Sequence, residues 1–220
     1  MPTLPGKPES AAPGLQGFDT ASPVSAAAAK AFRQAGFRYC VRYLSRGTPQ
    51  AAGDLSHAEA AAILAGGLAL MAVQHVLRPG WTPTAARGAG YGVAAASNAQ
   101  QCGLPPGVVV WLDLEGVRSG SMAADVIAYC NAWFDALAGA GYLPGIYVGA
   151  NGGLDGDALY WRLKTRHYWR SGSQVPELPH RGYQLVQRIS AMPDKVNGIA
   201  IDRDVTYTDA FGDSVVWLAP

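Results

Sequence analysis

Charged residues and cysteines are both scarce in this sequence. Of its 220 residues only 15% are Asp, Glu, Lys or Arg, and the formal net charge is +1. So small a positive charge excludes the electrostatic signature of a DNA- or RNA-binding protein, and nucleic acid is not an expected partner. The three cysteines, Cys40, Cys102 and Cys130, are odd in number and irregular in spacing. They predict buried free thiols, or one disulfide and one free thiol, rather than a disulfide framework.

Several motifs and segments are also missing. No apolar run reaches transmembrane length, so no membrane insertion is expected. The N-terminal sequence MPTLPGKPESAAPG lacks the apolar core of a signal peptide and predicts a flexible leader over residues 1–14. A dinucleotide-binding G-x-G-x-x-G, a serine-hydrolase G-x-S-x-G and metal-ligand spacing are all absent, so we predict no cofactor and no metal.

Short apolar segments of β character alternate with Ala-rich segments of helical period along residues 15–220. Eight segments are candidate strands, namely 15–19, 37–44, 68–76, 107–115, 144–150, 166–172, 183–188 and 198–205. Helices are expected after Ser22-Pro23, after Ser56 in capping-box spacing with Glu59, after Thr82-Pro83, over 121–141 and near 156–164.

Strand–helix alternation favours a parallel sheet, and eight strands favour its closure into a barrel. The sequence therefore predicts one α/β domain with a TIM-like (β/α)8 barrel. This barrel should be irregular in its last third, because the last strands are separated by segments too short for full helices. An open doubly wound sheet is the competing fold.

Acidic side chains interrupt three of the apolar strands near their ends: Asp19, the pair Asp113 and Glu115, and Asp202. Asp113 and Glu115 are two residues apart on one strand, so their side chains share a face. Two close carboxylates in a walled pocket do not both ionise easily, which gives one of them a raised pKa and makes it a candidate general acid. Glu115 is the better candidate, and Asp113 would orient it or hold a polar group of the substrate. A single Asp at a strand end is often only a helix cap or a loop anchor; the grouping of several is what indicates a site.

Further polar and aromatic residues near the same strand ends are candidates for substrate binding, since sugars pack on aromatic rings and bond to polar side chains. They are Arg42, Tyr43, His75, Tyr147, Trp169, Gln184 and Gln187. Core packing is the alternative role for each aromatic residue. Of the two glutamines, one is expected to point into the barrel mouth, and Arg42 is expected to be a buried partner of the carboxylates.

Four segments in their order resemble the DUF1906 (Rv2525c-like) glycoside-hydrolase-like domain family, which is related to the family 25 lysozymes. They are GFDTASPVSAAAAKAFRQAGFRYCVRYLS, VVVWLDLEGV, PGIYVGAN and GIAIDRDVT. The resemblance covers about residues 15–210 and implies a TIM-like barrel that acts on peptidoglycan or another cell-envelope polysaccharide. It places Asp19, Asp113, Glu115 and Asp202 at the positions that build the lysozyme site, with Glu115 as the acid. The chitinase pattern D-x-x-D-x-D-x-E is not met, because Trp111 replaces its middle Asp.

Three hypotheses follow for function. The first is a muramidase- or endolysin-like hydrolase that cuts the glycan strand. The second is a non-catalytic glycan-binding barrel that targets the envelope, and the third is a scaffold role in a larger phage or secretion assembly. The hydrolase is expected to be a monomer made in the cytoplasm that reaches the cell wall by release or injection, as a phage lysin or a secreted effector does.

Overall fold

The eight predicted strands close into one barrel. The structure, a computed structural model, describes residues 3–188 and 194–220. The barrel strands are β2 (Gln16–Thr20), β3 (Tyr39–Leu44), β4 (Ala69–Gln74), β5 (Val109–Leu114), β6 (Leu143–Val148), β7 (His167–Arg170), β8 (Leu185–Arg188) and β10 (Ile199–Thr206). Each strand pairs with its neighbours around the ring, and the β4–β5 pairing completes it. The expected TIM-like barrel is confirmed.

The expected irregularity of the last third is confirmed too. Strands β2 to β8 pair in parallel along the chain, whereas β10 runs antiparallel to both of its neighbours, β2 and β8. Only ten residues separate β8 from β10, and a parallel connection needs a crossover of a dozen or more. The reversal places the N-terminal half of β10 at the end of the barrel where the parallel strands finish, which we call the mouth.

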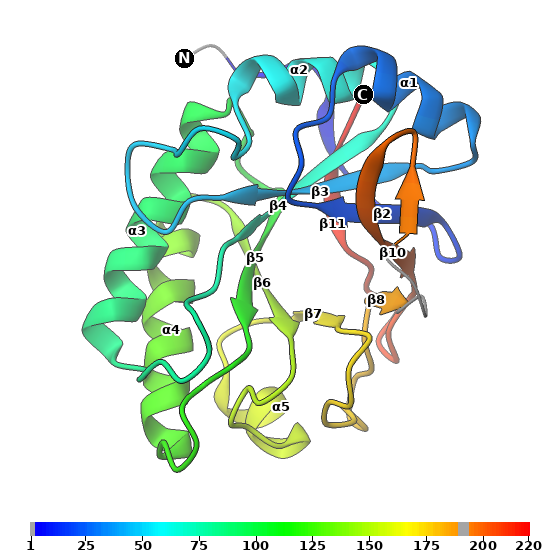
Figure 1. Cartoon of the computed structure of the whole chain (residues 1–220). Helices are drawn as coiled ribbons and strands as arrows, with labels where there is room; N and C mark the ends of the chain where they lie inside the picture. The colour runs from blue at the N-terminus through cyan, green and yellow to red at the C-terminus, as the bar shows by residue number, and fades with distance from the viewer. Residues whose placement is uncertain (1–2, 189–193) are drawn as a thin grey trace.

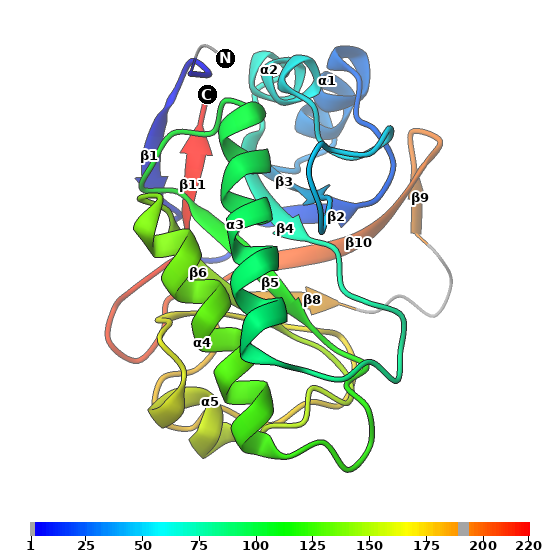
Figure 2. The same cartoon turned by 90° about the vertical axis from the view of Figure 1, so that its left-hand side faces the viewer.

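All five expected helices are present, namely α1 (Ala26–Gln34), α2 (His57–Ala65), α3 (Ala85–Gln101), α4 (Ala123–Gly139) and the short α5 (Gly156–Arg162). They lie outside the barrel, with α1 and α2 along one edge and α3 and α4 along the next (Figures 1 and 2). Ser56 caps α2 as expected, its side chain accepting from the Glu59 N–H at 3.1 Å, but α1 is capped by Ser25 instead of Ser22. In the described part of the chain, no helix has the length and apolarity to cross a membrane.

The N-terminal residues differ from the flexible leader that their composition predicts. Residues Lys7–Ser10 form β1, which pairs with β11 (Val216–Ala219) near the chain's other end (Figure 2). Leu4 and Ala11, on either side of β1, are each only 3% exposed. All four side chains of β1 are exposed, so its sequence lacks the alternating apolar pattern that marks a half-buried strand. A short hairpin strand, β9 (Asp194–Val196), pairs with β10.

Large side chains fill the barrel interior below the mouth. The Tyr39 and Trp111 rings lie fully buried there, and Trp217 of β11 packs against Tyr39 at a ring-centroid distance of 5.3 Å. Two strand glycines make room for these rings: a Cβ on Gly17 would lie 2.3 Å from the Tyr39 ring, and one on Gly145 would lie 2.4 Å from Trp111. The lower interior is therefore a packed core, and polar side chains gather toward the mouth.

Helices α3 and α4 approach closely through glycines that the sequence alone marks only as helix weakeners. A Cβ on Gly88 would lie 2.0 Å from the Tyr129 carbonyl oxygen, and one on Gly92 would lie 2.6 Å from that of Trp133. Both contacts are with backbone, which cannot rotate aside. The glycines thus set the distance between the two helices.

The three cysteines, Cys40, Cys102 and Cys130, are buried free thiols.

We expect Gly88→Ala to lower the free energy of unfolding by about 2–3 kcal/mol, since overpacking of a close contact costs this much. Gly90→Ala is the matched control, because Gly90 lies on the same helix with nothing within 4 Å of its Cβ position. Ala has the higher helix propensity, so this control should be neutral or stabilising by up to about 1 kcal/mol. Denaturant unfolding of both variants measures the difference, and equal stabilities would contradict the packing argument.

Candidate active site

Barrel closure brings the predicted acidic residues together at the mouth. Asp19 lies near the end of β2, Asp113 lies on β5, and Glu115 follows that strand. Asp202 lies directly opposite Asp19 in the antiparallel β2–β10 pairing. It reaches the mouth although it is only the fourth residue of its strand, because β10 runs in the reverse direction. Asp19 and Asp202, which are 183 positions apart in the chain, thus share one site.

Burial dominates the electrostatics of these groups. Asp19 is 2% exposed, and loss of hydration raises its pKa to about 7, with the Asp202 charge adding to the shift. Burial, together with the charges of Glu115 and Asp19, raises the pKa of Asp113 well above its usual range. Glu115 is half-buried, and desolvation raises its pKa also. These three carboxyl groups together therefore keep some of their protons at pH values where isolated carboxyl groups are ionised.

Glu115 is held in place by two neighbouring elements. The Trp81 indole N–H donates to the Glu115 backbone oxygen at 2.8 Å. On the other side lies Gly149, directly after β6, where an added Cβ would lie 2.4 Å from the Glu115 Cβ and 2.7 Å from its Oε2. Only glycine leaves room for this carboxyl group. Gly149 is a site residue that sequence reasoning missed, although a glycine directly after a strand was a usable signal.

A hydrogen-bonded chain of side chains crosses the mouth. The Tyr147 hydroxyl donates to Gln187 Oε1 at 2.9 Å, and Gln187 Nε2 donates to Asp19 Oδ2 at 2.8 Å. The Tyr43 hydroxyl donates to the other oxygen, Asp19 Oδ1, at 3.3 Å. Of the two candidate glutamines, Gln187 therefore faces the mouth. Tyr43 and Tyr147 are half-buried, so their rings remain reachable by a ligand.

Arg42 does not lie in the mouth, and its expected partnership with the site carboxylates is wrong. Alternation along β3 points Val41 and Tyr43 into the barrel and Arg42 outward, under the helices. Its Nε is 2.6 Å from Glu59 of α2, and its Nη1 donates to the Thr20 backbone oxygen at 2.6 Å. Arg42 and Glu59 form a buried ion pair that fixes α2 to the barrel.

Gln184 and Trp169 also lie away from the mouth. Gln184 is fully buried outside the barrel, where its Nε2 donates to Asp209 Oδ2 at 2.7 Å and its Oε1 lies 2.9 Å from His167 Nδ1. Trp169 is 1% exposed and packs against Trp111 at 5.6 Å between ring centroids. A ring so deeply buried cannot stack on a sugar, so its role is in the core, as the packing alternative predicts.

Asp204 is the second residue that sequence reasoning missed. It lies two residues beyond Asp202 on the same face of β10, deeper in the barrel, and is fully buried. The Trp169 indole N–H donates to its Oδ1 at 3.0 Å. Burial and the charge of Asp19 raise its pKa well above the usual range. The spacing Asp202-x-Asp204 was the available signal, since residues two apart on a strand share a face.

This arrangement suits proton transfer more than metal binding. Among residues 3–188 and 194–220, no group of three or more His, Cys, Asp or Glu side chains is arranged to hold a metal ion. Asp19, Asp113 and Asp204 are buried carboxyl groups that have no basic partner in the described part of the chain, whereas Glu115 is the more accessible. A half-exposed carboxyl group with a raised pKa can carry a proton at moderate pH and donate it to a leaving oxygen.

A closed barrel with a carboxyl cluster at its mouth defines the glycoside-hydrolase-like class of α/β barrels. Residues 30–206 match the model of the family described as Rv2525c-like, glycoside hydrolase-like domain. The chain belongs to this family, as its motifs indicate. No curated protein sequence matches it at a significant level.

Solved structures with the same fold include proteins from several sources. The Tat-secreted protein Rv2525c of Mycobacterium tuberculosis, in complex with L-tartrate, is 17% identical, with 92% of this chain and 99% of that chain covered and a TM-score of 0.66. The catalytic domain of endolysin ply40 from bacteriophage P40 of Listeria monocytogenes is 18% identical over 89% and 94%, with a TM-score of 0.61. The lysozyme from Streptomyces coelicolor is 18% identical over 90% and 94%, with a TM-score of 0.58. Identities this low establish the shared fold.

Proposed function

We propose that this protein hydrolyses the glycan strand of peptidoglycan or of a related cell-envelope polysaccharide, with Glu115 as the general acid. The observation that carries the proposal is the position of Glu115 at the barrel mouth, half-buried, with a raised pKa, beside the buried carboxyl groups of Asp113 and Asp19. The likeness to an endolysin and a lysozyme supports a cell-wall substrate. The protein would accordingly act at the cell wall.

In the proposed reaction, Glu115 protonates the glycosidic oxygen as the bond to the anomeric carbon breaks. Positive charge then develops on the sugar ring, and negative charge nearby stabilises it. Asp113 and Asp19 are suited to this role because their ionisation, costly in the buried site, becomes favourable once a cationic ring lies beside them. Water then adds to the anomeric carbon, and the proton it releases passes to the Glu115 carboxylate, which restores the acid.

Tyr43, Tyr147 and Gln187 would position the sugar. The two tyrosine rings border the mouth, and the hydrogen bonds Tyr147–Gln187 and Gln187–Asp19 hold the polar side chains in fixed orientations. Fixed orientation lowers the entropy lost on binding. A flat sugar face against one ring, with hydroxyl groups toward the Gln187 amide, matches the chemistry of these side chains.

The direct test is release of reducing ends from purified peptidoglycan by the purified protein. We expect steady release from at least one wall type, with soluble glycan fragments of uniform end chemistry. Absence of release from a panel of walls that differ in peptide and acetylation pattern would contradict the proposal.

A non-catalytic, envelope-binding role is the second candidate. Both oxygens of Asp19 are already engaged, one by Tyr43 and the other by Gln187, which favours a fixed binding surface over a reactive carboxylate. A binding protein would be retained on insoluble wall polysaccharide without releasing reducing ends. Its retention would also survive Glu115→Gln. In a hydrolase, by contrast, Glu115→Gln would abolish the release of reducing ends.

A further inference from the structure

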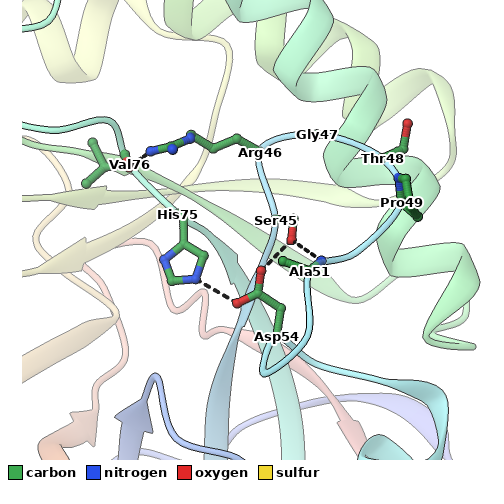
Figure 3. Close-up of a pocket in the computed structure, with 9 residues that line it drawn as sticks. All are labelled: Ser45, Arg46, Gly47, Thr48, Pro49, Ala51, Asp54, His75 and Val76. Carbon is green, nitrogen blue, oxygen red and sulfur yellow. Dashed lines mark hydrogen bonds and ion pairs between the residues drawn. The ribbon is translucent and has the colours of Figure 1, made fainter.

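A hollow of about 580 Å³ opens at the mouth of the barrel, the same end at which the carboxyl groups gather. It is lined by Ser45, Arg46, Gly47, Thr48, Pro49, Ala51, Asp54, His75 and Val76 (Figure 3). Residues 45 and 75 directly follow β3 and β4 at the mouth. The Tyr43 side chain connects the two places, because its hydroxyl donates to Asp19 while its ring stacks on His75 with centroids 4.5 Å apart. The hollow thus lies one side chain away from the proposed reaction centre.

The wall of this hollow is fixed before any ligand arrives. Asn98 of α3, fully buried, donates from Nδ2 to the backbone oxygens of Ser45 at 3.1 Å and Gly47 at 2.8 Å. Gln50 bridges the loop from within, accepting from the Ser45 N–H at 2.6 Å and donating to the Leu55 oxygen at 2.8 Å. A loop tied by its own polar groups is typical of a preformed binding site.

Among the described residues that line the hollow, the Asp54 carboxylate oxygens are engaged, whereas Arg46 has free donors. Asp54 has both oxygens engaged, since Oδ2 accepts from the Ser45 hydroxyl and Oδ1 lies 2.8 Å from His75 Nε2 (Figure 3). Arg46 donates from Nη1 to the Val76 oxygen. Its Nε and Nη2 have no hydrogen-bond partner among the described residues, and the side chain is only half-buried. A half-buried guanidinium with free N–H groups fits a carboxylate.

His75 adds a second recognition element. The Nε2–H tautomer of His75 donates a hydrogen bond to the Asp54 carboxylate, and in this tautomer Nδ1 is an acceptor. Nδ1 has no partner within the described parts of the chain. Arg46 binds the residue next to His75, so both groups lie on the same wall of the hollow. Together they match a ligand that carries a carboxylate near an amide N–H, which is the chemistry of a short acidic peptide.

We propose that the hollow binds the carboxylate-bearing peptide substituent of the glycan, with Arg46 on the carboxylate and His75 on a neighbouring amide. This inference rests on the proposed function and names its substrate class: a glycan whose sugar carries a peptide. The sugar ring would lie in the mouth against Tyr43, and its substituent would extend past that ring into the hollow. Arg46 is in this view a specificity residue that does not touch the reacting atoms.

The experiment compares two polymers, peptidoglycan with its peptides and the same glycan after enzymatic removal of the peptides. We expect Arg46→Gln to raise the KM for the peptide-bearing polymer about tenfold, which is the value of one charge-assisted hydrogen bond. The kcat on both polymers and the KM for the stripped polymer should stay unchanged. Arg46→Lys should recover part of the loss, because Lys keeps the charge without the planar fork.

Arg162→Gln is the matched control, since Arg162 is exposed at the end of α5 and lines neither the mouth nor the hollow. It should behave as the wild type on both polymers. An equal rise in KM on both polymers with Arg46→Gln, or no rise on either, would overturn the inference while leaving the hydrolase intact. Thermal unfolding of each variant separates a folding defect from lost recognition.

A binding experiment decides the inference if neither polymer is cut. Calorimetry would use a synthetic N-acetylmuramoyl dipeptide with a free carboxylate and the same molecule with that carboxylate amidated. We expect Arg46→Gln to weaken binding of the first about tenfold and to leave binding of the second unchanged. Equal wild-type affinity for the two ligands, or no measurable binding of the free carboxylate, would overturn the inference. Failure of cleavage alone would refute only the hydrolase.

Discussion

Replacing Glu115 by Gln should lower the rate of reducing-end release about a thousandfold, the typical contribution of a positioned general acid. Gln has the same shape but no proton to donate to the glycosidic oxygen. The backbone contact from Trp81 does not involve the side chain, so the position of residue 115 should persist. The wild-type rate should also fall as the pH rises through a Glu115 pKa that burial holds above the ordinary glutamate value. The alkaline fall arises because the acid acts only while it is protonated.

The control is Glu9→Gln, an equivalent change on the exposed strand β1. It should leave both the rate and the pH profile unchanged. A Glu115→Gln enzyme with near wild-type activity would assign the acid to another group, of which Asp113 is the nearest in the chain. If the wild type releases reducing ends, and Glu115→Gln still binds the polysaccharide but releases none, then the substitution affects the chemical step and not binding.

The positions of the barrel strands could be predicted because each combines an apolar run with clear turn residues at its ends. The strands at the chain termini could not. Exposed side chains on β1 hide its backbone pairing with β11, and that pairing depends on residues more than 200 positions apart. The segment before β10 is too short for a parallel crossover, which explains the antiparallel direction of this strand. In the sequence, that shortness predicted only an irregular barrel, not the direction of the strand.

The grouping of the acidic residues could be predicted because it depends on barrel closure alone. Asp19, Asp113 and Glu115 lie together because strand ends meet at the mouth of any such barrel. Side-chain direction limited the rest. Arg42 follows Val41, an interior residue, so it faces the helices and pairs with Glu59. Whether a residue near a strand end faces the mouth depends on the phase of alternation, which periodicity leaves undetermined when the strand is apolar on both faces.

Trp169 shows that sequence also leaves undetermined how deep in the barrel a side chain lies. Its strand, β7, points it inward, but its indole reaches down to Asp204 and not up to the mouth. Depth in a barrel follows from strand stagger, which sequence does not reveal. The two missed residues, Asp204 and Gly149, owe their importance to contacts made across the sheet. Each was visible in sequence only as an unexplained residue beside a strand end.

Asp19→Asn should raise the free energy of unfolding by about 4 kcal/mol at pH 8, the second large effect we expect. Burial raises the pKa of Asp19 to about 7 in the folded protein, against about 3.9 in an unfolded chain. Between these values the unfolded state releases the proton and the folded state keeps it, so wild-type stability falls as the pH rises from about 4 to about 7. Asn has no such proton, and its amide can still bond to Tyr43 and Gln187.

The gain in free energy of unfolding from Asp19→Asn should therefore be absent near pH 4, grow between about pH 4 and about pH 7, and stay constant at higher pH. Denaturant unfolding of wild type and variant at several pH values measures this difference. The control Asp125→Asn, on the exposed first turn of α4, should change stability by no more than about 0.5 kcal/mol at any pH. A pH-independent gain would mean that the amide packs better than the acid. A loss of stability at pH 8 would mean that the hydrogen bonds from Tyr43 and Gln187 outweigh burial and hold the pKa of Asp19 below its unfolded value. The predicted gain in stability, combined with lost activity, would show that Asp19 destabilises the folded protein and is nevertheless required for function.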